Sequence, residues 1–328
     1  MPKSNMVPRS VGIDVSKAKI DVAILFETTE YATQQFTNQN EAGIQECIDW
    51  LKSHNIQTKT PIVIESTGSY HWLVCLLLSE ALYQVHLINP LLTKKYQRGS
   101  IRGAKTDTID AKRLAEIGMI EHDLPIFFDT RDSLTSRKYQ TLYAKLTKVK
   151  QQLNRSYRDA VESAEIIGTS LQLETVEECL HQIQRTLNTL KKIIEENTSE
   201  MARQVAKIKG VSAFQASVLC NAVEGRKFSG KNQLIAFFGL DVQVKESGTW
   251  KGKSKISKRG NSFYRMVLFQ LGWSLSRHNE EFHDYYQRLR DNGKHYYTCL
   301  ISTARKFIKY FYAHFLKPYY QTTLDLSL

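Results

Sequence analysis

The first third of the chain alternates strand patterns with helical patterns. Short apolar or alternating runs predict five strands, at residues 11–15, 20–26, 31–37, 61–65 and 83–88. Apolar residues spaced by three and four predict three helices in the same region: one capped by Asn40, one over residues 70–82 and one over residues 107–118. We therefore expect a mixed α/β domain in which the first two strands form a hairpin.

The middle of the chain has the spacing of long amphipathic helices. Apolar residues step by three and four in two series, which are Leu142, Leu146, Val149 and Leu153, then Val176, Leu180, Ile183, Leu187, Leu190 and Ile194. Such seams are typical of coiled coils. Because residues 166–170 interrupt the pattern, we expect an antiparallel helical hairpin or an intermolecular coiled coil. Packing of both helices on the first domain would produce the same seams.

The last third predicts a mainly helical region. Helical spacing covers residues 213–223, 231–238, 262–276, 281–290 and 297–317. Residues 208–212 have the form of a helix-hairpin-helix turn, in which backbone N–H groups can contact a phosphate, although an ordinary helix start explains them more simply.

Composition and charge favour nucleic acid as a partner. The chain has 45 Lys and Arg against 33 Asp and Glu, a formal net charge of +12, which suits a polyanion or an anionic membrane surface. The longest apolar run, residues 72–78, is far too short to span a bilayer. The five cysteines form no C-x-x-C pair, so we expect reduced thiols in a cytoplasm and no zinc site.

Four carboxylates in the α/β region predict a metal site. Asp14 lies in the middle of the first strand, where a charge among apolar residues is costly unless it is paired or bound to metal. Glu65 ends the fourth strand, and strand ends are common places for sites in α/β sheets. Asp107 and Asp110 share one face at the start of the third helix.

Carboxylates suit Mg²⁺, with Mn²⁺ as a substitute, and two such ions about 3.5–4 Å apart can assist both oxygens of a phosphoryl transfer. Singly, Asp107 could be an N-cap and Glu65 a surface residue, but the joint placement predicts a metal centre. The small neighbours Gly12 and Ser16 lead us to expect room for a ligand beside Asp14. The nine histidines form no metal-binding pattern.

Several motifs resemble the DEDD family of insertion-sequence transposases. In the N-terminal half these are residues 11–17 (VGIDVSK), 64–70 (IESTGSY), 88–90 (INP) and 105–115 (KTDTIDAKRLA). In the C-terminal half they are residues 208–212 (IKGVS), 234–240 (LIAFFGL), 246–248 (ESG) and 256–261 (ISKRGN). The resemblance keeps the motif order and covers about residues 11–317.

The resemblance implies a RuvC-like, RNase H-like N-terminal domain whose Asp14, Glu65, Asp107 and Asp110 act together with a serine. That serine corresponds to Ser247, which would attack the DNA phosphodiester and form a phosphoserine. Many relatives have a second serine where this chain has Glu246, so Ser254 and Ser257 are alternative nucleophiles. In the family the carboxylates of one subunit meet the serine of another, and some members are site-specific invertases or are guided by a bridge RNA.

A basic segment surrounds the predicted nucleophile. Between residues 243 and 260 the chain carries Lys245, Lys251, Lys253, Lys255, Lys258 and Arg259 beside Trp250. Cations neutralise phosphates and an aromatic ring can stack on a base, so we expect this loop to bind nucleic acid, together with Lys105. A merely solvated basic loop is the ordinary alternative.

These patterns predict three domains: a RuvC-like α/β catalytic domain at 1–130, a coiled-coil helical hairpin at 131–205 and a mainly helical transposase domain at 206–328. We expect a bacterial cytoplasmic, nucleoid-associated DNA transposase or recombinase. It would be guided by a noncoding RNA and would assemble as a homodimer or homotetramer through the coiled coil. A RuvC-like junction resolvase or nuclease using metal-activated water is one alternative, and a non-catalytic nucleic-acid-binding protein is another.

Overall fold

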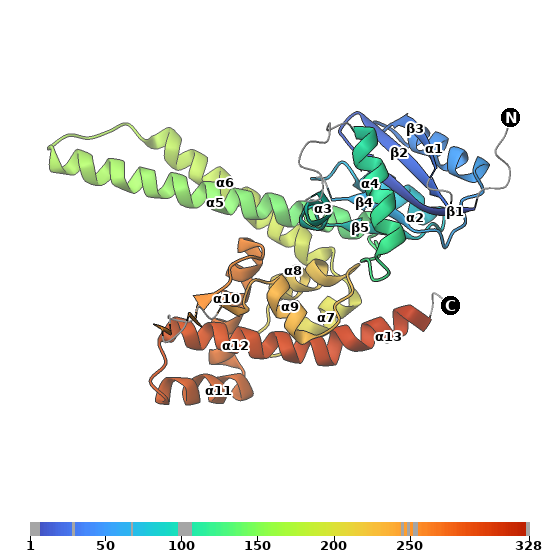
Figure 1. Cartoon of the computed structure of the whole chain (residues 1–328). Coiled ribbons are helices and arrows are strands. Elements are labelled where there is room, and N and C mark those ends of the chain that lie inside the picture. The colour runs from blue at the N-terminus through green and yellow to red at the C-terminus, as the bar shows by residue number, and fades with distance from the viewer. Residues whose placement is uncertain are drawn as a thin grey trace. The chain divides into compact units, whose positions relative to one another are not determined.

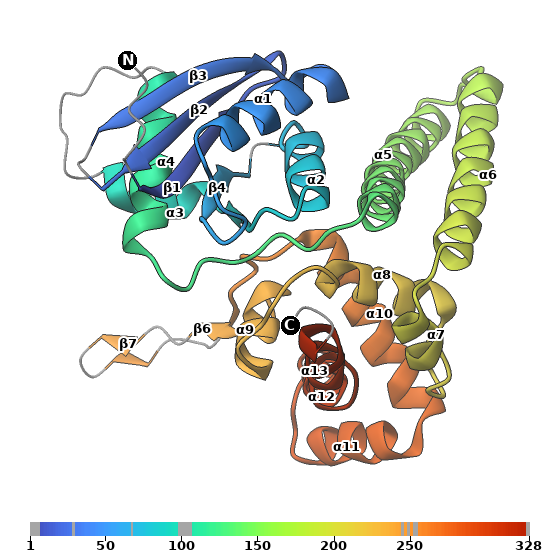
Figure 2. The same ribbon diagram turned by 90° about the vertical axis from the view of Figure 1, so that its right-hand side faces the viewer.

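The computed structural model describes residues 7–27, 30–66, 68–97, 107–243, 246–247, 250–251 and 255–325. These residues form two compact units, each described separately below (Figures 1 and 2). Unit 1 comprises Met1–Leu134 with Gly225–Lys227, and unit 2 comprises Thr135–Glu224 with Phe228–Leu328.

Unit 1 is built on a five-stranded sheet with the order β3-β2-β1-β4-β5. The strands are β1 (Pro8–Val15), β2 (Lys19–Phe26), β3 (Tyr31–Thr37), β4 (Ile62–Glu65) and β5 (Val85–Ile88). β1, β2 and β3 are antiparallel neighbours, whereas β4 and β5 extend the sheet from β1 in parallel. All five predicted strands are confirmed, and their arrangement is consistent with an RNase H-like domain.

Different helices cover the two faces of this sheet. Alternate β1 residues Val11, Ile13 and Val15 are buried in a core with α1 (Glu41–Ser53) and α2 (Trp72–Glu80). The predicted N-cap is confirmed, because the Asn40 side chain accepts a hydrogen bond from the Gly43 N–H at 3.0 Å. The opposite face of the sheet packs against α4 (Asp107–Ile120).

The close contact between β1 and α4 depends on small residues. A Cβ atom on Gly12 would lie 2.0 Å from the Ala111 carbonyl oxygen, and Ser10 Oγ donates to the Ala115 carbonyl at 2.6 Å. The expectation that Gly12 leaves room for a ligand is therefore wrong, because the α4 backbone occupies that space. Ser16 also has a structural role, since its Oγ donates to the Lys19 carbonyl in the turn before β2.

Three helices of the structure have no counterpart among the predicted elements: α3 (Pro90–Gln97), α7 (Glu200–Ala206) and α13 (Lys317–Asp325). The Asn89–Pro90 pair that follows β5 ends the strand and also begins α3. Proline is also favoured in the first turn of a helix, since its fixed φ suits that turn and its missing N–H would have no helical partner there.

Unit 2 is mainly helical. Its helices are α5 (Arg131–Ile166, which begins in unit 1), α6 (Glu174–Glu196), α7 (Glu200–Ala206), α8 (Ala213–Val223), α9 (Lys231–Phe237), α10 (Ser262–His278), α11 (Glu280–Asp291), α12 (Tyr296–Phe311) and α13 (Lys317–Asp325). A π-helical turn, Tyr312–Leu316, joins the last two. The predicted start of α8 is confirmed and carries a capping box between Ser212 and Gln215.

The long helices α5 and α6 lie side by side and antiparallel (Figure 1). Lys150 donates to Gln184, and Tyr157 donates to Glu177. The seam of α6 points inward, with Leu187, Leu190 and Ile194 buried. The α5 seam is not buried in this pair, since Leu142 and Val149 remain 46% and 47% exposed. The two helices are therefore antiparallel neighbours, as a helical hairpin requires, whereas coiled-coil packing of the two seams stays a prediction.

Candidate active site

The alternation of side chains along the strands gathers charged residues on the sheet face that α4 covers. Asp14 follows Gly12 on that face of β1, and its antiparallel partner on β2 is Asp21. Ile13 pairs with Ile64 of β4, so Glu65 lies one step further along, beside Asp14. Strand periodicity alone thus brings these three carboxylates together.

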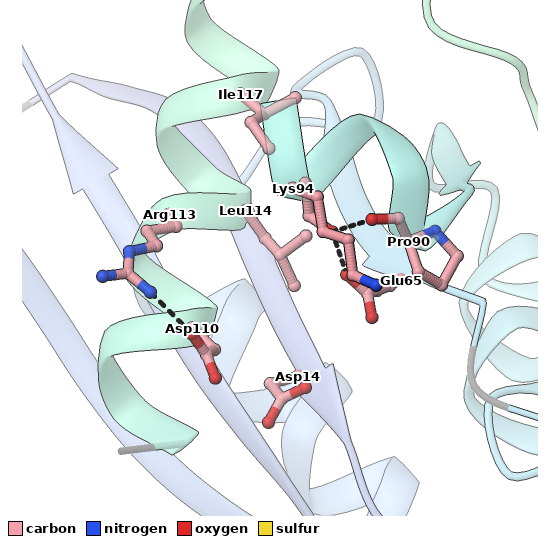
Figure 3. Close-up of a pocket in the computed structure, with 9 residues that line it drawn as sticks. Asp14, Glu65, Pro90, Lys94, Asp110, Arg113, Leu114 and Ile117 are labelled. Carbon is pink, nitrogen blue, oxygen red and sulfur yellow. Dashed lines mark hydrogen bonds and ion pairs between the residues drawn. The ribbon is translucent and has the colours of Figure 1, made fainter. Parts of the chain in front are cut away.

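A pocket of about 170 Å³ lies between this face, α3 and α4 (Figure 3). Its lining residues are Asp14, Glu65, Pro90, Thr93, Lys94, Asp110, Arg113, Leu114 and Ile117. Three of the four predicted carboxylates therefore line one pocket. The fourth, Asp107, is the first residue of α4, and its negative charge contributes to the raised pKa of Asp14.

The pocket concentrates negative charge around Asp14. Partial burial, followed by the charges of Asp110, Asp107, Asp21 and Glu65, raises the pKa of Asp14 to about 6. An Asp with a normal pKa would be almost fully ionised at pH 6, whereas the raised pKa of Asp14 favours its protonated form there. A bound cation would offset the carboxylate repulsion, which is the second cause of this shift after burial.

Glu65 is oriented by a residue that sequence analysis missed. Thr93 of α3 donates its hydroxyl hydrogen bond to Glu65 Oε2 and is itself buried. The Thr93 hydroxyl also lies 2.9 Å from the Pro90 carbonyl oxygen. The helical turn after Pro90 therefore holds the Glu65 carboxylate in place.

The two aspartates of α4 have cationic partners in this conformation. Arg113 lies 3.0 Å from Asp110 Oδ1, one helical turn away. Lys19 of β2 bridges Asp107 at 2.9 Å and Asp21 at 3.2 Å, and these contacts raise the pKa of Lys19. Lys19 could have been found from the alternation on β2, which places Lys19 and Asp21 on the same face as Asp14.

The donor set fits a hard divalent cation in type, because it offers carboxylate oxygens from two strands and one helix. Within the described parts of the chain, however, no three His, Cys, Asp or Glu side chains are grouped so that they could hold one ion. Metal binding thus requires the carboxylates to draw together, and Lys19 to release Asp107 if that residue is a ligand.

The predicted serine lies in a β-hairpin rather than in the expected loop. Glu246 and Ser247 form β7, which pairs with β8 (Trp250–Lys251), while β6 (Val242–Gln243) pairs with β9 (Lys255–Ile256). Lys105, Lys245, Lys253 and Ser254 lie outside the described residues.

The residues that follow this hairpin form hydrogen bonds with the segment that precedes it. Ser257 Oγ donates to Asp241 Oδ1, which gives this alternative nucleophile a structural partner. Lys258 has a left-handed backbone, with φ of 56°, and its N–H donates to the Gly239 carbonyl. Both Lys258 and Arg259 are exposed, as a phosphate contact requires.

Comparison with known proteins identifies the family. A model described as Transposase, of the DEDD IS110 type, matches residues 11–161, and a model described as Transposase IS116/IS110/IS902 family matches residues 202–287. The chain belongs to the IS110 family of DEDD transposases. The first match spans all the pocket carboxylates of this transposase, and the second spans Ser247 and the basic hairpin.

A characterised relative supports a role in DNA recombination. The transposase is 25% identical over 316 residues to a pilin gene-inverting protein from Moraxella bovis. The alignment covers 92% of this chain and 94% of that protein. The transposase is therefore an enzyme that acts on DNA. None of its described helices combines the length and apolar character needed to cross a bilayer.

Proposed function

We propose that this transposase is a metal-dependent DNA recombinase that cuts and exchanges strands through a phosphoserine at Ser247. The observation that supports this most strongly is the pocket, where Asp14, Glu65 and Asp110 meet beside Asp107. These four carboxylates would hold Mg²⁺ or Mn²⁺, which would supply Lewis-acid stabilisation of the reacting phosphate oxygens.

The residues of the chain would divide the remaining work. Thr93 fixes Glu65, while Lys94 and Arg113 place two cations at the pocket wall, where a DNA phosphate would enter. Ser247 Oγ would form a bond to phosphorus as the bond to a deoxyribose oxygen breaks, and that oxygen would take the proton that serine loses. Serine is a weak nucleophile at its free pKa, so the metal centre must assist this exchange.

The same proposal includes an oligomer and a guide RNA. The exposed apolar residues Leu142 and Val149 on α5 would pair with a second copy in a coiled coil, forming a dimer or tetramer. One subunit would then contribute the carboxylates and another the serine. A noncoding RNA would select donor and target DNA by base pairing, in the bacterial nucleoid.

A suicide DNA substrate tests the covalent step. We expect the wild type to form a covalent DNA adduct in Mg²⁺ and neither Asp14→Ala nor Ser247→Ala to form it, while Ser257→Ala still does. Cleavage without an adduct would support the nuclease alternative, in which metal-activated water replaces the serine. An adduct that persists in Ser247→Ala would show that another residue is the nucleophile.

A further inference from the structure

Unit 2 carries a row of aromatic rings outside the predicted active site. The Tyr297 ring stacks on Phe269 with centroids 5.7 Å apart and on His295 with centroids 5.5 Å apart, at interplanar angles of 28° and 25°. One helical turn after Phe269, Trp273 is covered by the Arg277 guanidinium at 4.4 Å from its ring centroid. The row thus runs along one face of α10 and onto the start of α12.

Two of these rings lie largely outside the core. Tyr297 is 60% exposed and Trp273 is 39% exposed, whereas Leu268, Leu271 and Leu275 are fully buried on the other side of α10. Leaving large aromatic surfaces in water loses the free energy that burial would contribute. The row is therefore a surface available to a partner.

The charge around the row favours an anionic partner. Residues 247–279 contain seven Lys and Arg and no Asp or Glu, and residues 292–324 contain five Lys and Arg and no Asp or Glu. These two segments include all of α10 and α12. A partner that fits this surface has flat rings, which can stack on the aromatic side chains, and negative charges, which can pair with Lys and Arg.

We propose that His295, Tyr297, Phe269 and Trp273 form a stacking site for unpaired bases of single-stranded DNA. Stacking uses the π-face that every base has, and Arg277 and Lys294 are placed to contact the phosphates between stacked bases. Duplex DNA keeps its bases stacked inside the helix, so it cannot use these rings. This inference rests on the proposed strand exchange, because strand exchange leaves DNA bases unpaired near the enzyme.

Fluorescence anisotropy of labelled oligonucleotides tests the site on the full chain in EDTA, where no cleavage occurs. We expect Trp273→Ala and Tyr297→Ala each to weaken binding of single-stranded DNA about tenfold, which lies within the range for one stacked base. Binding of a duplex, and of a strand whose central nucleotides lack bases, should change less than about twofold. Trp273→Phe and Tyr297→Phe should retain most of the affinity.

A matched control is Phe128→Ala, which removes a 49% exposed ring from unit 1 and should leave binding unchanged. Unchanged single-strand binding by both alanine variants would overturn the proposal, as would equal losses for single strands, duplexes and base-free strands. A loss confined to RNA of the same sequence would assign the surface to RNA and overturn the DNA assignment. Because no cleavage is involved, the covalent step can fail while this site stands, and the reverse also holds.

Discussion

The two units of the transposase differ in where they place charged residues. Unit 1 gathers carboxylates on one face of a sheet, where partial burial and then their mutual repulsion raise the pKa of Asp14. Unit 2 contains two 33-residue segments, 247–279 and 292–324, without a single carboxylate. The carboxylates of the first region repel a phosphate unless a cation is bound, whereas the second region has the charge to attract it directly. In the proposed function, this difference assigns the chemistry to unit 1 and the direct contacts with DNA phosphates to unit 2.

The largest effect expected concerns the chemistry of unit 1. Asp110→Asn should lower strand exchange by about a thousandfold or more, since it removes a charge from a site whose members act as a unit. DNA binding should be retained, because a pocket carboxylate repels phosphate. Recombination and binding assays measure the two effects. Asp123→Asn, a charge loss elsewhere in unit 1, is the control, and activity of Asp110→Asn within tenfold of wild type would contradict the site.

The next effect concerns the packing that places the carboxylates. Gly12→Ala should destabilise unit 1 by about 3 kcal/mol or more, because the new Cβ meets the α4 backbone, which cannot move away as a side chain can. Gly230→Ala in unit 2 meets nothing within 4 Å and should cost about 1 kcal/mol or less. Chemical denaturation measures both variants. Equal stability of the two would show that α4 does not depend on this contact.

A smaller effect concerns the lysine beside the pocket. Lys19→Met should bind Mn²⁺ severalfold more tightly than wild type, because Lys19 no longer competes for Asp107 and Asp21. Calorimetric titration of Mn²⁺ measures the change. Lys52→Met removes a lysine from an exposed ion pair with Asp49 and should leave the affinity unaltered. Weaker binding by Lys19→Met would mean that Lys19 instead orients the ligands.

The pKa of Asp14 predicts a pH-dependent effect on stability. A carboxyl whose pKa rises on folding stabilises the protein fully below pH 3.8, and this contribution is lost as the pH rises through about 6. Asp14→Asn should therefore raise the melting temperature of the metal-free transposase at pH 7.5, with a smaller gain at pH 5. Asp49→Asn is the control in this scanning fluorimetry experiment. A gain that does not depend on pH would contradict a raised pKa at Asp14.

The smallest effect concerns the direct contacts of unit 2. Arg259→Ala should weaken duplex DNA binding a few fold and reduce the slope of log K against log salt by about 0.9, the value for one lost phosphate contact. Arg203→Ala should not change the slope, because Arg203 is paired with Glu200 at 2.8 Å. An unchanged slope for Arg259→Ala would remove that residue from the DNA surface.

Sequence patterns predicted the five strands of unit 1, its helices α1, α2 and α4 and three of the carboxylates that line its pocket, because all of these depend on local periodicity. The position of Asp14 in a buried strand and the spacing of Asp107 and Asp110 were visible without coordinates. The contact of Thr93 with Glu65 was not visible, because it joins helix α3 to a strand 28 residues earlier. The salt bridge from Lys19 to Asp107 was not predictable for the same reason, since it joins residues 88 positions apart.

The sequence by itself determined which residue types are present and which face of each element they occupy, because periods of 2 and 3.6 follow from backbone geometry. Only the tertiary structure decided what each face meets. Gly12 packs against the backbone of a helix and leaves no space for a ligand, and Leu142 stays exposed although its spacing suits a coiled-coil seam. The reason is physical: periodicity orients a side chain, but its partner depends on how distant segments pack to exclude water.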